Sequence, residues 1–530
     1  MAGDHNCGHA PRIDDEAATE ARVVQLNELI ADLDVAVTHG DDAVDVAGIA
    51  DDSRRVEPGF AYVVRHAAGA TQDALGGDNG AYVDAAIAAG SAAVIDTRAA
   101  TAARGLGVQS LAGELAARCF GRPAEALRVV GVTGTNGKTT VATLTQHLLN
   151  AAGVRCGLIG TIHTDLGDAA GPTEAELTTP GAIGLQAMLA TMRDRGLQAA
   201  AIEVSSHAIH QGRADAVPLA AAVFTNLSGD HLDYHGTMQR YGDEKARLLD
   251  RLADGATAVI NADDPWCASL IDRVPAGRRA MVCSMSAETS KPDATVAITG
   301  HDAGMSVRLV GPWGEVEAAV PLVGDHNAMN VLQAAAAAWA VGEPRGMTVD
   351  GLREGLTTLP VVPGRLEVVH AAEAAGDGPL VLVDYAHTDD ALDKALRAVR
   401  PIADRRGGRL HVVFGCGGDR DRTKRPRMMR VACEYAGRVV ATSDNPRTED
   451  PEAILDEVVA GCVDRPGLAV EREADRAAAI GRAIEQAEAR DVVLIAGKGH
   501  ETYQVLGTER IDFDDREVAA AALEHKGATA

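Results

Sequence analysis

The sequence has few positive charges for its size, few aromatic side chains and no closely paired cysteines. It contains 50 Lys and Arg residues against 76 Asp and Glu residues, which gives a formal net charge of −26. A chain this acidic repels polyanions, so we do not expect nucleic acid as a partner. Aromatic residues make up only 3% of the chain, so the hydrophobic cores must be built mainly from Ala, Val and Leu.

Cysteine usage and hydropathy predict the compartment. The eight cysteines include no CxxC pair, which is typical of reduced thiols in a cytoplasmic protein rather than of a disulfide framework. Residues 1–20 lack the apolar segment of a signal peptide. The longest apolar run, around residues 334–341, is too short to span a bilayer. We therefore expect a cytoplasmic protein with no membrane partner, and we expect it to be a monomer.

The length and the order of apolar segments predict an α/β protein of three domains. A chain of 530 residues exceeds what one core usually serves. We predict an N-terminal α/β domain at residues 22–126, a central domain with a mostly parallel sheet at 127–360 and a C-terminal Rossmann-like α/β domain at 361–530. Residues 1–21 are polar, and we predict a disordered tail there. His5, Cys7 and His9 could hold a metal, although incidental residues of a tail explain them equally simply.

The central domain begins with the most informative stretch, residues 129–140, which reads VVGVTGTNGKTT. It predicts a buried strand, a tight glycine turn and a helix over residues 140–150. Backbone N–H groups in such a turn approach phosphate oxygens, a lysine neutralises charge and a threonine hydroxyl can hold Mg²⁺. The usual pattern has glycine where Val132 stands, so the motif here is GxxGKTT. We predict an ATP site made of Gly134, Thr135, Asn136, Gly137, Lys138, Thr139 and Thr140.

Polar residues follow the other predicted strands of this domain, near residues 155–160, 199–204, 220–226 and 257–261. Ligands of parallel sheets bind beyond the carboxyl ends of the strands. Glu203 ends one strand, and His231 follows another within the sequence DHLDYH. A carboxylate and an imidazole facing the glycine turn could complete a Mg²⁺ site, but helix capping is the alternative.

A lysine interrupts the apolar side of the helix predicted over residues 237–252. Met238, Tyr241, Leu248 and Leu249 form a stripe at helical spacing, and Lys245 lies within it. An unpaired buried ammonium is unfavourable, so this lysine either extends to solvent or has a buried partner.

Further polar loops follow strands predicted in the C-terminal domain near residues 380–383, 410–414, 438–441 and 492–495. The loop at residues 415–426 is rich in arginine, and it is either a solvated basic loop or the positive site that an anionic ligand requires. Asn330 could contact nucleotide or could simply cap a helix. The Ser-Arg turn at Ser53 could bind a phosphate or could be an ordinary capped turn.

Taken in order, these segments resemble one known family. The matching motifs are DSRRVEPG, GVTGTNGKTT, TTPG, EVSSHAIHQGR, TNLSGDHLDYHGTM, the pair Tyr241 and Lys245, VPGRLEVV, DYAHT, FGCGGDRDRTKRP, DNPRTEDP and GKGHE. They cover nearly the whole chain. The sequence resembles the Mur ligases, ATP-dependent amide-forming enzymes of peptidoglycan synthesis, and most closely those that add the third peptide residue. The DNPR motif resembles that of members that add meso-diaminopimelate.

The resemblance implies a fold and a set of roles. The fold would have a central P-loop-type ATPase domain between a UDP-binding and an amino-acid-binding domain. Lys138, Lys245, His231 and Glu203 would be catalytic, and Mg²⁺ would be held by Thr139, Glu203, His231 and Lys245 as a carbamate. ATP would also contact Asn330, Arg365 and Asp384. The UDP-N-acetylmuramoyl dipeptide would contact Ser53, Thr178, Thr179, Ser205, Gln211 and Arg213. Diaminopimelate would contact Arg420, Asp444, Asn445, Pro446, Arg447, Gly497 and Glu501.

The expected reaction is formation of an amide through an acyl phosphate, with ATP and Mg²⁺. Addition of L-lysine or another diamino acid, and a folylpolyglutamate-synthetase-like activity, are the alternatives. Two departures from the family pattern affect the sugar-nucleotide side: Leu177 stands where Asn is usual, and residues 69–80 replace an expected loop of the first domain.

Overall fold

The computed structural model describes residues 23–41, 43–64, 79–97, 110–286, 291–300, 304–370, 378–463 and 465–529. The predicted tail, with His5, Cys7 and His9, lies outside the described residues, as does most of the loop at 69–80. The chain divides into two compact units. One contains Met1–Val296, Leu309–Val316 and Asn330–Thr358; the other contains Ala297–Arg308, Glu317–Met329 and Leu359–Ala530.

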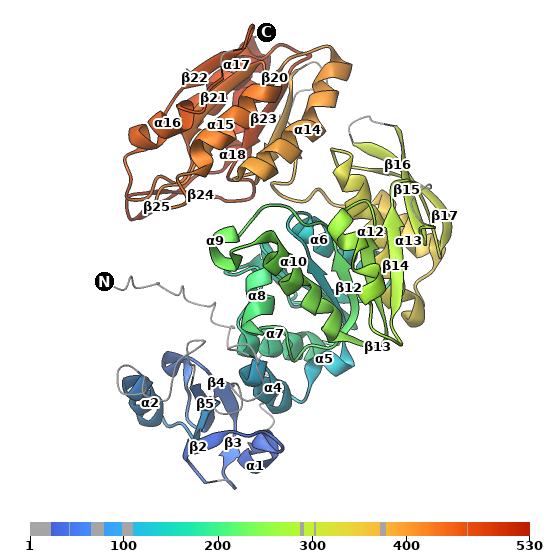
Figure 1. The fold of residues 1–530 in the computed structure, drawn as a ribbon, viewed down its shortest axis with the longest axis vertical. Helices are drawn as coiled ribbons and strands as arrows, with labels where there is room; N and C mark the ends of the chain where they lie inside the picture. Colours follow the sequence, from blue (N-terminus) through green and yellow to red (C-terminus); the bar gives the residue numbers. More distant parts are fainter. Residues whose placement is uncertain are drawn as a thin grey trace. The chain divides into compact units, whose positions relative to one another are not determined.

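The first part of the first unit is a small α/β layer (Figure 1). Its four-stranded sheet has the order β2-β6-β5-β4, in which β4, β5 and β6 are parallel and β2 is antiparallel to β6. The elements are β1 (Val24–Gln25), α1 (Leu26–Ile30), β2 (Ala36–His39), β3 (Asp45–Val46), β4 (Gly48–Ala50), the 3₁₀ turn η2 (Ser53–Arg55), β5 (Phe60–Val64), α2 (Asn79–Ala88), β6 (Ala93–Asp96), α4 (Ser110–Cys119) and α5 (Pro123–Ala126).

The mostly parallel central sheet that the sequence predicts is present. Within the described residues, its eleven strands run in the order β10-β9-β8-β11-β7-β12-β13-β14-β15-β16-β17. The neighbours β8, β11, β7, β12, β13 and β14 are parallel, and β9 and β10 are added antiparallel at one edge. The strands up to β14 are β7 (Arg128–Thr133), β8 (Cys156–Ile159), β9 (His163–Asp165), β10 (Thr173–Glu174), β11 (Ala199–Glu203), β12 (Leu219–Phe224), β13 (Leu252–Asn261) and β14 (Arg279–Ser284). The helices are α6 (Lys138–Ala151), α7 (Ala182–Asp194), α8 (Ser206–Gln211), α9 (Leu232–His235), α10 (Met238–Ala246) and α11 (Pro265–Ala268).

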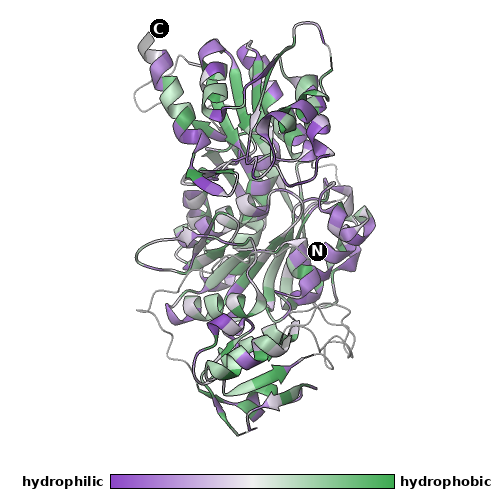
Figure 2. Cartoon of the chain, turned by 90° about the vertical axis from the view of Figure 1, so that its left-hand side faces the viewer, coloured by the Kyte–Doolittle hydropathy of each residue, from purple (hydrophilic) through white to green (hydrophobic). Residues whose placement is uncertain are grey.

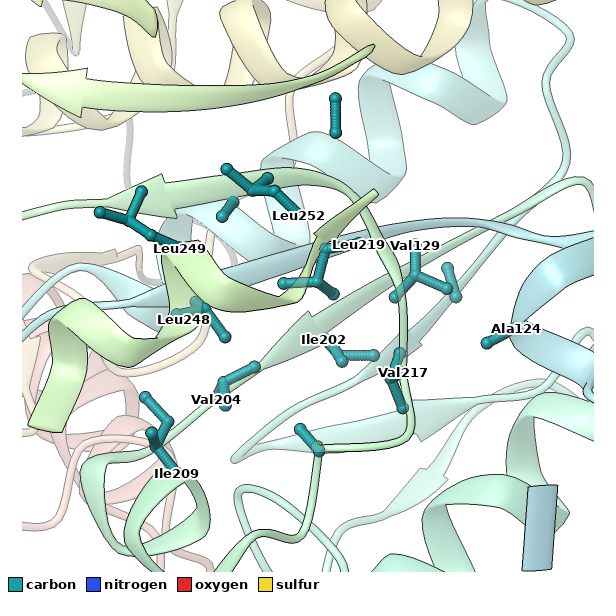
Figure 3. Packing of buried hydrophobic residues seen from close by; sticks show 14 of the residues in the cluster. Ala124, Val129, Ile202, Val204, Ile209, Val217, Leu219, Leu248, Leu249 and Leu252 are labelled. Carbon is teal, nitrogen blue, oxygen red and sulfur yellow. The ribbon is translucent and has the colours of Figure 1, made fainter. Parts of the chain in front are cut away.

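One predicted helix is shorter than expected. The segment predicted as a helix over 237–252 is helical only to Ala246, continues as the 3₁₀ turn η4 (Arg247–Arg251) and joins β13, which starts at Leu252 rather than at 257. Leu248 and Leu249 both belong to the main core of this domain, and Leu252 pairs with Leu219 of β12 (Figure 3). The tighter turn allows the chain to bury these leucines and enter the sheet at once.

Three further strands, β15 (Ala294–Gly300), β16 (Met305–Gly311) and β17 (Gly314–Val320), continue the central sheet beyond β14. The other elements up to residue 358 are α12 (His326–Gly342) and α13 (Val349–Thr357), with the 3₁₀ turns η5 (Ile271–Arg273) and η6 (Glu343–Arg345). The β-rich stretch predicted before a long alanine helix is therefore confirmed.

The C-terminal part is built on a six-stranded sheet of order β18-β19-β23-β20-β21-β22, which is parallel except for β18. Its strands are β18 (Glu367–Val369), β19 (Leu380–Asp384), β20 (Leu410–Cys416), β21 (Arg438–Ser443), β22 (Ala469–Arg472) and β23 (Val492–Ala496), and a separate hairpin pairs β24 (Tyr503–Leu506) with β25 (Glu509–Asp512). Its helices are α14 (Asp389–Arg406), α15 (Lys424–Tyr435), α16 (Pro451–Val459), α17 (Arg476–Gln486) and α18 (Asp515–Thr529).

Helices cover both faces of this C-terminal sheet. Successive strand residues point to opposite faces, so each strand packs against helices on both sides. Val412 packs in a cluster with residues of α14, α15 and α16, whereas Val413 packs in another cluster with residues of α17 and α18. The strands are correspondingly hydrophobic throughout, and the hydrophilic residues lie mainly on the helices and loops (Figure 2). None of the helices in the described part of the chain combines the length and apolar character that crossing a bilayer requires.

Candidate active site

The glycine loop joins the buried strand β7 to helix α6, and its shape requires two glycines. Gly134 has a φ of 147° and Gly137 a φ of 84°. A Cβ atom at Gly134 would lie 1.8 Å from Thr225 Oγ1, and one at Gly137 would lie 2.7 Å from Asn330 Oδ1. Larger residues therefore do not fit at either position. Asn330 lies beside the loop and inside helix α12, and its contact with nucleotide stays a prediction.

Hydrogen bonds from the neighbouring strand end hold the loop in place. Thr135 N donates to Asn226 O at 2.8 Å, and Asn136 N donates to Asn226 Oδ1 at 3.1 Å. The Thr225 hydroxyl donates to Asn136 O at 2.6 Å. The helix that follows begins at Lys138, two residues before the predicted start, and its N-cap is Gly137, which has no side chain to cap it. An N-terminus of this kind favours an anionic ligand.

Two lysines converge on one carbonyl oxygen of the loop. Lys138 Nζ donates to Gly134 O at 3.0 Å and to Thr135 O at 2.9 Å, and Lys245 Nζ donates to Gly134 O at 2.8 Å. The Lys245 side chain is 1% exposed and its ammonium lies 4.5 Å from the centre of the Tyr241 ring. Lys245 therefore has buried partners and does not extend to solvent.

The surroundings of Lys245 favour its neutral amine. Burial lowers the pKa of Lys245 well below its usual value, and the nearby charge of Lys138 lowers it further. A deprotonated amine is the nucleophilic form of lysine.

The carboxylate of Glu203 is fixed by two threonines. Glu203 ends β11 and is 1% exposed. Its Oε2 accepts from Thr139 Oγ1 at 3.0 Å and from Thr161 Oγ1 at 3.1 Å, and its Oε1 accepts from Thr161 N at 2.7 Å. The Thr161 and Thr178 hydroxyls are 3.1 Å apart. The structure thus brings together Thr139 and Glu203, two of the residues predicted for a metal site. It also shows a role for Thr161, which the sequence analysis missed. The only sequence signal for Thr161 was its position after a predicted strand.

His231 lies at the side of the two lysines. It has a φ of 52°, and its ring is 3.4 Å from Asp230. Burial lowers the pKa of His231; the carboxylate of Asp230 opposes this shift, and Lys138 and Lys245 add to it. The ring is therefore neutral at pH 7 and can act as a ligand. In the described part of the chain, however, no three His, Cys, Asp or Glu side chains gather into a ready metal site.

The residues predicted to contact the sugar peptide form a second network around Thr179. Its hydroxyl donates to Glu203 O at 2.8 Å and accepts from Ser205 N at 3.1 Å. Arg213 donates to Thr179 O and to Gln211 Oε1, at 2.8 Å in each case. Thr178, Thr179, Ser205, Gln211 and Arg213 therefore lie together.

Two residues of the sugar-nucleotide prediction stand apart from this network. Ser53 begins the 3₁₀ turn η2, which Asp52 caps, so the capped-turn interpretation of that motif is confirmed and a phosphate there stays a prediction. Leu177, which stands where the family usually has Asn, is 55% exposed.

In the second unit, the loops after β21 and β23 meet. Asn445 Nδ2 donates to Glu501 Oε2 at 3.0 Å. Arg447, with a φ of 52°, donates to Gly418 O at 2.9 Å and to Asn445 O at 3.3 Å. At Gly497, a Cβ atom would lie 3.0 Å from Asp444 Oδ2. Except for Arg420, which is exposed and donates to Asp419 O, the predicted diaminopimelate residues form one cluster, here called the amino-acid cluster: Asp444, Asn445, Pro446, Arg447, Gly497 and Glu501.

Two basic residues missed by the sequence analysis support this cluster. Lys498 is fully buried and donates to Asn445 Oδ1 at 3.1 Å and to Glu501 Oε2 at 3.0 Å. Arg476 is also buried; it donates to Ser443 O and Ala496 O, the ends of β21 and β23. Lys498 could have been found from its place in the GKGHE motif, whereas no pattern in the sequence marks Arg476.

The predicted nucleotide residues Arg365 and Asp384 lie close to each other. Asp384 accepts from Leu366 N at 2.8 Å and from Ala386 N at 2.9 Å. Burial raises the pKa of Asp384, and the charge of Arg365 opposes this shift. The Arg365 guanidinium lies 4.8 Å from the centre of the Tyr385 ring.

Comparison with known proteins identifies the family. The profile of the Mur ligase middle domain matches residues 132–338, and that of the Mur ligase glutamate ligase domain matches residues 364–499. A protein of Synechococcus elongatus named UDP-N-acetylmuramoyl-L-alanyl-D-glutamate–2,6-diaminopimelate ligase is 44% identical over 521 residues, covering 96% of this chain and 97% of its own length.

Solved structures agree with this likeness. The structure of a UDP-N-acetylmuramoyl-L-alanyl-D-glutamate–2,6-diaminopimelate ligase has a TM-score of 0.65 and 33% identity, covering 95% of this chain and 99% of that one. The MurF ligase of Thermotoga maritima in complex with ADP shares the fold, with a TM-score of 0.57 and 17% identity over 91% of this chain and 98% of its own. The chain belongs to the Mur ligase family.

Proposed function

We propose that this chain is an ATP-dependent ligase that adds meso-2,6-diaminopimelate to UDP-N-acetylmuramoyl-L-alanyl-D-glutamate in peptidoglycan precursor synthesis. The observation that carries the proposal is the nearly full-length likeness to relatives that bear this activity in their names. The folylpolyglutamate-synthetase alternative lacks such support, and L-lysine is disfavoured by the positive charge at Arg447 described below.

The loop around Gly134 would bind ATP. Lys138 and the N-terminus of α6 place positive charge where phosphates would lie. The oxygen atoms of Thr139 and Glu203 suit Mg²⁺, and the neutral His231 could complete its ligands. Bound Mg²⁺ would neutralise charge on the transferring phosphoryl group. These residues fit the ion, and Asn330, Arg365 and Asp384 would contact the rest of the nucleotide.

Lys245 would act as a carbamate. Its neutral amine can add CO₂ with loss of one proton, which converts an uncharged buried amine into an anion suited to a metal. The charge of Lys138, which disfavours the protonated form of Lys245, would attract the carbamate.

The reaction would proceed in two steps. A substrate carboxylate attacks the γ-phosphorus of ATP, which forms an acyl phosphate and releases ADP. The amine of diaminopimelate then attacks the acyl carbon, and the tetrahedral intermediate expels phosphate and a proton. Positioning and charge neutralisation supply most of the catalysis. Thr178, Thr179, Ser205, Gln211 and Arg213 would orient the sugar peptide, and Ser53 would contact its uridine end.

The amino-acid cluster would select the incoming substrate. The hydrogen bonds of Arg447 within the cluster go to backbone carbonyls, so its charge is not neutralised by a carboxylate there. Its planar guanidinium can grip the distal carboxylate of diaminopimelate, and Glu501 can accept from the distal ammonium. L-lysine lacks that carboxylate, so the bound substrate would offer Arg447 no anionic partner.

The setting of the reaction is also a proposal. We propose a monomer in the cytoplasm, where ATP is available, with small molecules as its only substrates and neither nucleic acid nor membrane as a partner. The division into domains at 22–126, 127–360 and 361–530 would assign uridine, ATP and amino-acid binding in that order.

The test is ligation by the purified protein with ATP, Mg²⁺ and the UDP-linked dipeptide, comparing meso-diaminopimelate with L-lysine. ADP release and the mass of the product are measured together. We expect rapid formation of the tripeptide with diaminopimelate and a kcat/KM lower by at least about 100-fold with L-lysine. Equal turnover of the two amino acids would refute the assignment of the substrate.

A further inference from the structure

Lys498 is a buried cation among the residues proposed to bind the amino acid. It lies between Gly497 and Gly499, directly after β23, and its side chain is fully buried. Its ammonium donates to Asn445 Oδ1 at 3.1 Å and Glu501 Oε2 at 3.0 Å. A buried ammonium requires partners of this kind, because isolated burial of the charge is strongly unfavourable.

The same ammonium fixes the orientation of the Asn445 amide. Asn445 Oδ1 accepts from both Lys498 Nζ and Val505 N, the latter at 2.9 Å. With its oxygen occupied in this way, Asn445 presents its NH₂ group to Glu501 Oε2, at 3.0 Å. Lys498, Asn445 and Glu501 thus form a closed triangle of hydrogen bonds.

The charges of the cluster depend on Lys498. Asp444 and Glu501 contribute two carboxylates, and Lys498 lies 3.7 Å from the first and 3.0 Å from the second. Two further buried cations nearby have carboxylate partners of their own: Arg476 lies 2.7 Å from Asp515, and Arg425 lies 2.8 Å from Glu449. Counted by charge alone, Lys498 and Arg447 equal the two carboxylates in number, although of these two cations only Lys498 contacts them. Without Lys498, the cluster has a net negative charge.

We propose that Lys498 determines the preference for a dicarboxylate amino acid, as a positioning residue that acts through Glu501 and Asn445. This inference rests on the proposed function. Diaminopimelate carries one more carboxylate than lysine and the same two amino groups, so it has one more negative charge in every protonation state of the amines. A cluster whose own carboxylates are already neutralised favours the dicarboxylate, whereas an excess of carboxylate favours the more cationic lysine.

The proposal is tested with a charge cycle at two positions. The variants are Lys498→Met, Glu501→Gln and the double variant, and the readout is the ratio of kcat/KM for meso-diaminopimelate to that for L-lysine. Meso-diaminopimelate and L-lysine both carry the distal ammonium, so losing its contact with Glu501 weakens both substrates. A change in the ratio of kcat/KM values therefore reports the charge of the cluster. We expect Lys498→Met to lower the ratio by at least about 10-fold, Glu501→Gln to raise it, and the double variant to return towards the wild-type ratio.

Controls separate this role from simple support of the fold. Lys498→Arg keeps the charge and is expected to keep the preference. His411→Asn breaks a buried contact with Asp491 at the opposite, amino end of the strands and is expected to lower stability without moving the ratio. If Lys498→Met does not fold, Lys498→Gln, which removes the charge but keeps a hydrogen-bond donor, takes its place in the cycle.

The outcomes distinguish the inference from the function on which it rests. Activity of the wild-type protein with diaminopimelate tests the function alone. A ratio that stays constant across the cycle, with both substrates weakened equally, would overturn the role of Lys498 and leave the function intact. Absence of ligation by the wild-type protein would overturn the function, and the same cycle measured by calorimetric binding of the two amino acids would still decide the role of Lys498.

Discussion

At the scale of single residues, the hydrogen bonds from Thr161 to Glu203 have a functional consequence. One residue supplies two of the three side-chain hydrogen bonds that orient this carboxylate, through its N–H and its hydroxyl. Replacing a group that orients a metal ligand typically lowers metal affinity or activity by about 10–100-fold. Thr161 therefore belongs to the proposed metal site although it would not touch the ion.

We predict that Thr161→Val lowers activity about 10-fold and raises the Mg²⁺ concentration needed for half-maximal rate, since one donor to Glu203 is lost. The measurement is initial rate against Mg²⁺ concentration at saturating ATP. Thr191→Val is the matched control, because that hydroxyl donates to Ala187 O within α7 and should leave the Mg²⁺ curve unchanged. Identical Mg²⁺ curves for Thr161→Val and the wild-type protein would contradict this role.

Individual site residues could be predicted only where their type conflicts with their position or belongs to a motif. Lys245 was visible because a lysine interrupts an apolar stripe, and the structure shows it buried with partners rather than extended to solvent. Its position alone left two interpretations open, because a sequence pattern does not show what a side chain meets. Thr161 and Arg476 fit their local surroundings and gave no such conflict, and their partners are distant in the sequence.

Among the secondary-structure elements, helix α18 is joined to the sheet by a buried ion pair. Asp515, in its first turn, accepts two hydrogen bonds from Arg476 at 2.7 Å, and both side chains are fully buried. Arg476 also bonds the carbonyls at the ends of β21 and β23. The pair thus connects the last helix to the two strands that lead into the amino-acid cluster.

We predict that Arg476→Met destabilises the protein by about 3–5 kcal/mol, because it leaves the Asp515 carboxylate buried without its partner. The double variant Arg476→Met with Asp515→Leu should recover much of this loss, since neither charge then remains. Urea unfolding followed by circular dichroism measures both. Equal destabilisation by the single and the double variant would show that the charge of Asp515 is not the cause.

At the same scale, the sheets were predictable and the segment after α10 was not. Continuous valine and alanine runs predict parallel strands covered on both faces, and β7, β11 and β12 are such strands. The turn η4 escaped prediction because Leu248, Leu249 and Leu252 satisfy a helical spacing, and only the packing of the whole domain requires the chain to turn earlier.

For the whole molecule, the excess of acidic residues means that anionic substrates depend on a few local cations. The net charge is −26, yet Lys138 lies at the glycine loop, and Arg447, which donates to backbone carbonyls, lies at the amino-acid cluster. Each unit therefore holds positive charge at the site assigned to it, which suits phosphate in one and carboxylate in the other.

The central claim is that this chain activates a carboxylate as an acyl phosphate before an amine attacks it. The most direct measurement uses the UDP-linked dipeptide labelled with ¹⁸O in the reacting carboxylate, followed by mass spectrometry of the released phosphate. The account predicts that one ¹⁸O atom per turnover appears in inorganic phosphate, together with ADP. Recovery of the label in AMP, or unlabelled phosphate accompanying the amide product, would contradict it.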